Sequence, residues 1–222
     1  TSLAALALGR TRADEQATRR ALRWLVGQEG TGPPFLIWLS YKLFPERQLV
    51  ELNPSFRGWP WAPGTFGFVE PTSYAVVALK ALRPLAPRRA RERIRDAERM
   101  LLDRICAGGG WNYGNTRVLD VDLEPFPDTT ALALIALQGR APTEPVRQSF
   151  VKLEEMLRTN DSGLTLALSI ICYRRYDLDT APLVARLEQR FQAASFLGET
   201  RTLALATLAL ATANVFQTED HA

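Results

Sequence analysis

The chain has 222 residues, of which 46% are hydrophobic, 23% charged and 9% aromatic, and its formal net charge is +3. This share of apolar side chains excludes a disordered chain, and no uncharged apolar run approaches the ~20 residues that cross a bilayer. Two cysteines exclude a disulfide-stapled scaffold. The single histidine, His221, excludes an interior Ser-His-Asp triad and most histidine-based metal sites, so we expect no metal ion and no cofactor.

An apolar octet recurs along the chain. The first copy spans residues 1–8 (TSLAALAL), and two close matches lie at 72–79 and 130–137. Weaker copies lie at 163–170 and 201–208. Each copy consists of strong helix formers and lacks a polar face, so it predicts a helix that is buried on all sides.

A charged segment with apolar residues at helical spacing follows each of the first four octets. The segment 87–106 contains seven arginines and four acids. We expect these charges to form a solvent-exposed helix face, supported by the pairs Arg88–Glu92 and Asp96–Arg99, rather than a patch for nucleic acid or an anionic membrane. The four segments that predict amphipathic return helices are 14–28, 87–106, 142–158 and 180–194.

A buried helix followed by a half-exposed helix, repeated along the chain, predicts two layers. The inner layer is apolar, and the outer layer is amphipathic with its polar side in water. We therefore expect an all-α fold of helical hairpins, arranged as a closed or incomplete α/α toroid or stacked as a solenoid.

Residues 31–71 interrupt this repeat as an irregular insertion and aromatic loop. The part at 33–44 (PPFLIWLSYKLF) is apolar enough to form a divergent sixth inner helix or a lid. Its aromatic side chains recur every third residue, at Phe35, Trp38, Tyr41 and Phe44. We expect this stripe to pack in the core, and membrane contact is the alternative.

Two loops rich in glycine, proline and aromatic residues precede the second and third octets, at 53–71 and 107–128. Each loop ends with a residue that can cap the following helix, Thr72 in one case and Asp128 in the other. The loops also carry the aromatic and acidic side chains that we expect to bind a ligand. These candidates are Trp59, Trp61, Glu70, Trp111, Tyr113 and Glu124.

The order glycine-tryptophan, turn and T-x-x-A-x-x-A-L resembles the repeat of the prenyltransferase β-subunit and squalene/terpene cyclase superfamily. Residues 58–79 and 108–139 carry this resemblance most clearly. It implies that residues 1–222 form a single α/α-toroid domain. It also implies a deep apolar cavity between the inner helices, which related proteins use to hold isoprenoid chains.

Class II terpene cyclases carry a D-x-D-D motif just before T-A, and its central acid protonates an alkene or epoxide. Aligning that T-A with Thr130 and Ala131 places Asp128 at the central acid, without the flanking carboxylates. Asp120 and Asp122 form another D-x-D six residues earlier. These three aspartates are the candidate catalytic acids, and a structural cap is the alternative role for Asp128.

Other members of the fold use chemistry that this sequence supports less well. Protein prenyltransferases hold zinc with an Asp, a Cys and a His, and no interior histidine is present here. Toroidal glycosidases place paired carboxylates across an aromatic groove, for which the loop tryptophans and acids are candidates. If the protein is an enzyme, the resemblance implies a terpene cyclase-like or prenyltransferase-like activity that does not depend on zinc.

Two hypotheses on function therefore stand. In the first, the protein binds an isoprenoid or other long apolar molecule in the toroid cavity, with catalysis by atypical acids left open. In the second, it is a non-enzymatic scaffold for a protein partner. We expect no nucleic-acid partner, a cytoplasmic location, and membrane contact that is at most peripheral. The chain begins directly on an inner octet, which fits a toroid that is truncated at its N-terminus.

Overall fold

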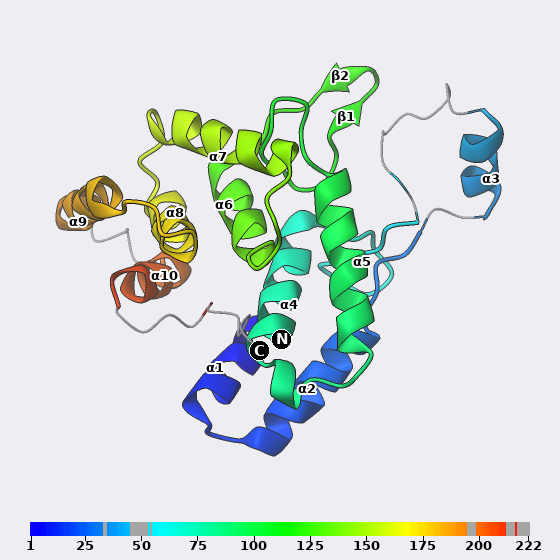
Figure 1. Cartoon of the computed structure of the whole chain (residues 1–222), viewed down its shortest axis with the longest axis horizontal. Helices are drawn as coiled ribbons and strands as arrows, with labels where there is room; N and C mark the ends of the chain where they lie inside the picture. Colours follow the sequence, from blue (N-terminus) through cyan, green and yellow to red (C-terminus); the bar gives the residue numbers. More distant parts are fainter. Residues whose placement is uncertain (33–34, 45–52, 54, 195–198, 212–215, 217–222) are drawn as a thin grey trace.

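A computed structural model describes residues 1–32, 35–44, 53, 55–194, 199–211 and 216. Within these residues the fold is all-α (Figure 1). The described strands, β1 (Arg117–Val118) and β2 (Val121–Asp122), pair as one short antiparallel hairpin. No described helix combines the length and the hydropathy that are needed to cross a membrane.

The five octets lie in helices that form one row. In chain order, α1 packs against α4, α4 against α6, α6 against α8, and α8 against α10. Each helix includes most of its octet, which confirms the predicted inner helices. Their bounds are α1 (Ser2–Thr11), α4 (Val69–Ala81), α6 (Pro127–Ala136), α8 (Gly163–Arg175) and α10 (Thr200–Leu210).

The four charged segments form a second layer of helices outside this row. Each outer helix packs against the inner helix that precedes it in the chain, so the units are α-helical hairpins. A short 3-10 helix, η2 (Arg83–Leu85), connects α4 to its outer partner. The outer helices are α2 (Glu15–Gly27), α5 (Ala90–Asp103), α7 (Glu144–Leu157) and α9 (Ala181–Ala194).

Burial differs between the middle and the ends of the inner row. In α4, α6 and α8, the ranges 72–81, 129–136 and 165–172 are buried on every side of the helix. The two end helices bury only one side, because Leu3 of α1 is 46% exposed and Leu203 of α10 is 45% exposed. The prediction of complete burial is therefore correct for the middle helices and wrong for the ends, which have a row neighbour on one side alone.

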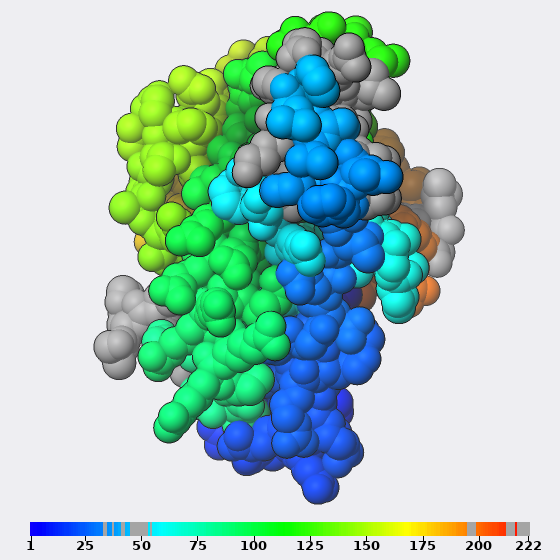
Figure 2. Space-filling view, turned by 90° about the vertical axis from the view of Figure 1, so that its right-hand side faces the viewer, coloured from blue at the N-terminus to red at the C-terminus, as the bar shows by residue number. Residues whose placement is uncertain are grey.

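The insertion contains one described helix, α3 (Phe35–Leu43), which lies beside the two layers (Figures 1 and 2). Phe35 is 69% exposed and Phe44 is 43% exposed, so the predicted core stripe is wrong for these two residues. Phe35 stacks on Trp38 with ring centroids 5.9 Å apart, and the side chain of Tyr41 lies outside the described residues. The three-residue spacing predicts a helix correctly, but it does not predict that Phe35 and Phe44 are exposed.

Candidate functional site

The two glycine-tryptophan loops are held to their inner helices by the same hydrogen bond. The backbone N–H of Trp59 donates to Thr72 Oγ1 at 2.8 Å, and that of Trp111 donates to Thr130 Oγ1 at 2.9 Å. Both threonines lie one turn inside the helix and are fully buried. The threonine that opens the octet therefore anchors the preceding loop.

This arrangement corrects the predicted helix caps. The N-cap residues are Phe68 for α4 and Phe126 for α6, and neither helix has a side-chain cap. Each helix begins before the predicted residue because a proline stands in its first turn, where a missing N–H breaks no helical hydrogen bond. Thr72 and Asp128 are consequently inside their helices rather than at the caps.

The two loop tryptophans also bind the end of the preceding outer helix. The indole N–H of Trp59 donates to the carbonyl of Leu25 in α2 at 2.7 Å, and that of Trp111 to the carbonyl of Leu101 in α5 at 2.6 Å. Arg93 stacks over the Trp59 ring, 4.3 Å from its centroid. Trp59 is 3% exposed and Trp111 is fully buried, so both rings are mainly part of the core.

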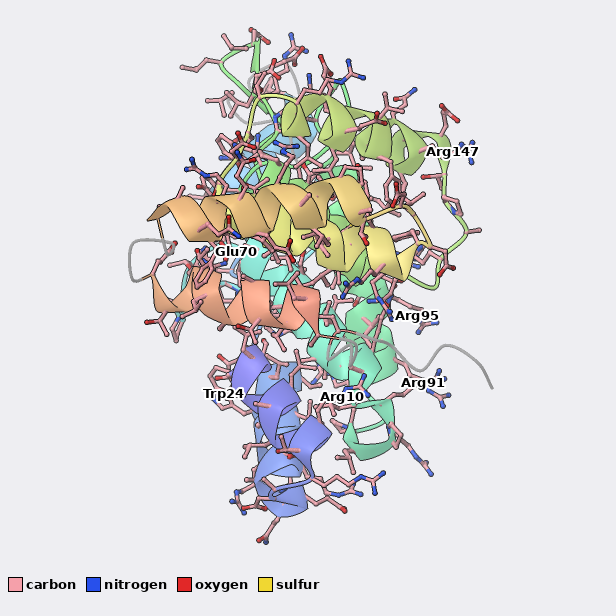
Figure 3. All side chains as sticks on the ribbon, turned by 90° about the vertical axis from the view of Figure 1, so that its left-hand side faces the viewer. Arg10, Trp24, Glu70, Arg91, Arg95 and Arg147 are labelled. Atoms are coloured by element: carbon pink, nitrogen blue, oxygen red, sulfur yellow. The ribbon has the colours of Figure 1, made fainter. Side chains whose placement is uncertain are left out.

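A pocket of about 410 Å³ lies beside Trp59, at the N-terminal ends of α1, α4 and α10. The C-terminal half of α2 and the loop 59–63 complete its wall. Trp24 and Trp61, 51% and 59% exposed, supply much of its aromatic surface. Figure 3 shows Trp24 and Glu70 on the same side of the molecule, near the N-terminal end of α10. This pocket is the candidate functional site.

One polar cluster lies within this aromatic wall. Arg201 of α10 forms an ion pair with Glu70 in the first turn of α4, and the Glu70 side chain is only 14% exposed. Arg201 also donates a hydrogen bond to Tyr74 Oη at 3.1 Å, with its guanidinium 6.0 Å from the ring centroid. The cluster joins two inner helices that are far apart in sequence.

The charges of this cluster act on the Tyr74 phenol. Burial raises the pKa of Tyr74 above its usual 10.0, the nearby carboxylates of Glu70 and Asp128 raise it further, and Arg201 opposes them. Burial lowers the pKa of Arg201, but Tyr74 and Glu70 outweigh this effect and raise it above its usual value. At neutral pH the phenol is therefore protonated beside a charged guanidinium. Because Arg201 donates to its oxygen, the phenol can offer its own O–H to a ligand.

The candidate acids of the second loop lie elsewhere. Asp120 and Asp122 belong to the β1–β2 hairpin, are 98% and 64% exposed in their side chains, and each lies 3.7 Å from Arg117. Glu124 is 86% exposed and lies 3.9 Å from Lys152. The structure therefore does not bring these three carboxylates into the pocket.

Two further candidates, Asp128 and Tyr113, do not line the pocket. Asp128 is half-buried in the first turn of α6, close enough for its charge to raise the pKa of Tyr74. Tyr113 is 55% exposed and packs on Phe126, with ring centroids 5.0 Å apart, outside the pocket wall. Of the nine predicted site residues, the pocket wall contains Trp59, Trp61 and Glu70.

Sequence reasoning missed Trp24, Tyr74 and Arg201. Tyr74 and Arg201 could have been identified from the sequence, because both depart from the octet pattern. Arg201 takes the first position, where three copies have threonine, and Tyr74 adds a phenol to an otherwise apolar face. Trp24 carried no such signal, since it is one of several apolar residues on an amphipathic helix.

The described residues contain no group of three or more His, Cys, Asp or Glu side chains that could hold a metal ion. No protein-family model matches the chain, and no curated protein matches it significantly.

Proposed function

We propose that this protein is a repeat protein of the prenyltransferase and squalene cyclase type, with a toroidal arrangement of its hairpins. In this proposal it binds an isoprenoid or another long apolar molecule in the pocket between α1, α4 and α10. The observation that carries the proposal is the aromatic pocket with one polar cluster, Glu70–Arg201–Tyr74.

The size and the chemistry of the pocket support a ligand of this kind. Small-molecule sites commonly measure 300–1,000 Å³ and combine apolar walls with a few polar groups that fix orientation. The pocket measures about 410 Å³, and Trp24, Trp61 and Leu3 offer apolar surface. A ligand with a polar end, such as an alcohol, would accept a hydrogen bond from Tyr74 while its chain lies along the tryptophans.

We propose that the ligand binds at the N-terminal ends of α1, α4 and α10 rather than in a central cavity between the inner helices. The resemblance implies a deep central cavity, but the side chains of α4, α6 and α8 are buried among their neighbours. The ion pair between Arg201 of α10 and Glu70 of α4 supports a row that curves, because it links two helices that are not neighbours in the row. Catalysis by Asp128 remains a prediction, because this carboxylate adjoins the Tyr74 cluster without lining the pocket.

The test uses the full chain and a C15 isoprenoid alcohol, farnesol, followed by tryptophan fluorescence. We expect Trp24→Ala and Trp61→Ala each to weaken binding about tenfold, because each removes a large apolar contact. Val151→Ala is the matched control, since Val151 is 69% exposed on α7, away from the pocket. Absence of farnesol binding, together with organic extracts that contain no lipid by mass spectrometry, would contradict the proposal.

One observation favours the second candidate, a scaffold for a protein partner. Trp24, Trp61 and Phe66 are 51%, 59% and 53% exposed, and aromatic residues of this kind are enriched in protein interfaces. This candidate predicts that Trp24→Ala and Trp61→Ala abolish pull-down of a partner while lipid extracts stay empty. Trp59 and Trp111 are unsuitable for this test, because their rings belong to the core.

A further inference from the structure

We propose that a second pocket, at the opposite end of α4, binds a ligand that carries two or more phosphate groups. This pocket measures about 720 Å³ and lies between the C-terminal end of α4, η2 and the first half of α5. Its wall includes apolar residues such as Ile94, and no carboxylate. We call it the basic pocket, because its wall also contains five cationic residues: Lys80, Arg83, Arg88, Arg91 and Arg95.

The four arginines of the basic pocket have no acidic partner in the described part of the chain. The predicted pair Asp96–Arg99 is present at 3.5 Å, but the predicted Arg88–Glu92 pair is absent from the described ion pairs. Elsewhere, exposed arginines of outer helices pair with acids, as Arg147 does with Glu144 at 2.7 Å. The guanidinium groups of the basic pocket are therefore free to bind an external anion.

Lys80 has a different role from these arginines. Its Nζ lies 2.8 Å from Glu98 Oε1 and donates to the carbonyls of Ala136 and Gln138 at 2.9 and 2.7 Å. These three partners accept the three N–H groups of the ammonium, so the Lys80 side chain is held in place at the base of the basic pocket. The ligand contacts would come from the arginines.

The location of the arginines adds to the positive potential. Arg88 and Arg91 flank the first turn of α5, where the helix dipole is positive and further cations are unfavourable. The first turn of α5 also contains one acid, Glu92, which the two arginines outnumber. A bound anion would offset the repulsion that the α5 arrangement creates.

The spacing of the arginines indicates more than one phosphate group. Arg91 and Arg95 are four residues apart, so they share one face of α5 about 6 Å apart along its axis, and Arg88 lies in the turn that precedes the helix. A single phosphate ion is too small to reach all three, whereas linked phosphates match successive guanidinium forks. Figure 3 shows Arg91 and Arg95 on the side of the molecule opposite Glu70 and Trp24, so this site is separate from the candidate pocket.

The test is calorimetric titration of the full chain with sodium tripolyphosphate. We expect the double variant Arg91→Gln/Arg95→Gln to bind about 100-fold more weakly, roughly tenfold for each charged hydrogen-bonding group removed. The control is Arg147→Gln/Arg158→Gln, which removes the same charge from one exposed position of α7 and from the exposed residue that follows its last turn. We expect it to keep affinity within about threefold, because screening weakens charges at that distance.

Two more measurements complete the test. Without phosphate, the Arg91/Arg95 double variant should melt no lower than the wild type, which separates lost binding from lost folding. Vesicles of phosphatidylcholine with phosphatidylinositol bisphosphate then distinguish the source of the phosphate. Vesicle binding that the Arg91/Arg95 variant loses assigns the site to a lipid headgroup, and tripolyphosphate binding alone assigns it to a soluble ligand. The proposal is overturned if tripolyphosphate does not bind or if both double variants lose affinity equally.

Discussion

At the residue scale, two glycines allow the tryptophan loops to approach their inner helices. A Cβ added to Gly58 would lie 2.2 Å from Thr72 Oγ1. A Cβ added to Gly110 would lie 2.9 Å from Thr130 Oγ1, and Gly110 also has a φ of +77°, which other residues rarely adopt. The glycine of each glycine-tryptophan pair therefore permits the hydrogen bond that anchors the loop.

We expect Gly58→Ala and Gly110→Ala each to lower the free energy of unfolding by about 2–3 kcal/mol, because the new methyl group displaces the threonine. Gly27→Ala is the control, since a Cβ there meets nothing within 4 Å and Gly27 ends helix α2. The control should be neutral or stabilising by about 0.5–1 kcal/mol. Urea denaturation measures all three, and equal effects of the three substitutions would refute the steric explanation.

Tyr173 gives a prediction for alkaline pH. Burial raises its pKa from 10.0 to about 12, with smaller contributions from Cys172 and Glu154. The unfolded chain therefore loses this proton first, so the free energy of unfolding should fall as pH rises from about 10 towards 12 and should not respond below that window.

Tyr173→Phe should remove this contribution and leave a shallower loss of stability across the same pH window. Urea denaturation of both proteins on either side of the window measures the difference. Burial also raises the pKa of Tyr74 and Tyr176, so some alkaline loss should remain in the variant. Identical pH profiles for the two proteins would show that Tyr173 ionises equally in the folded and unfolded states.

At the scale of elements, a buried ion pair joins α4, α5 and α6. It lies near the C-terminal end of α4, away from the candidate pocket. Lys80 of α4 pairs with Glu98 of α5 and donates to the carbonyl of Ala136, the last residue of α6, and to that of Gln138 just beyond it. Arg140 adds a second cation, 2.7 Å from Glu98. Because the Lys80 and Glu98 side chains are 10% and 7% exposed, neither charge can be satisfied by water when its partner is removed.

We expect Lys80→Met to lower the free energy of unfolding by about 3–5 kcal/mol, since it leaves helix carbonyls and a buried carboxylate with fewer partners. The double variant Lys80→Met/Glu98→Met should recover part of this loss. Arg19→Gln is the control, because it breaks only the exposed pair with Glu15 and should cost less than about 1 kcal/mol. Thermal and urea denaturation test these values, and a strictly additive double variant would exclude coupling between the two residues.

Hydrophobic periodicity predicts some features of the helices correctly and misses others. The periodicity of 87–106 predicts a helix, and the structure shows one, α5, at Ala90–Asp103, because apolar spacing indicates which face of an outer helix is buried. The prediction that the aromatic stripe of α3 packs in the core is wrong for Phe35 and Phe44, because periodicity identifies a helix but does not show whether another surface covers it. Arg91, Arg95 and Arg99 of α5 face solvent as predicted, but the prediction is wrong for Arg93 and Glu98, which are buried. Which acids pair with the arginines depends on side-chain positions that spacing does not fix.

At the scale of the whole molecule, stability should be highest in the middle of the row. Helices α4, α6 and α8 each have two row neighbours and an outer helix, whereas α1 and α10 leave one side exposed. We expect backbone amides in the three middle helices to exchange most slowly with solvent and those in α1 and α10 to exchange sooner, because opening an end helix exposes less apolar surface. Hydrogen-exchange mass spectrometry measures this order, and protection in α10 equal to that in α6 would contradict it.

The helical layers of this protein can be predicted from the local pattern of the amino-acid sequence. Octets without a polar face become inner helices and charged amphipathic segments become outer helices, because burial follows local hydrophobic pattern. Which residues come together depends instead on how the helices pack. Trp24, Glu70 and Arg201 come from distant parts of the chain and share one pocket, while Trp111 is buried in the core and Asp122 is exposed on a hairpin. A site of this kind depends on how helices pack in three dimensions, and the spacing of residues along one segment does not contain that information.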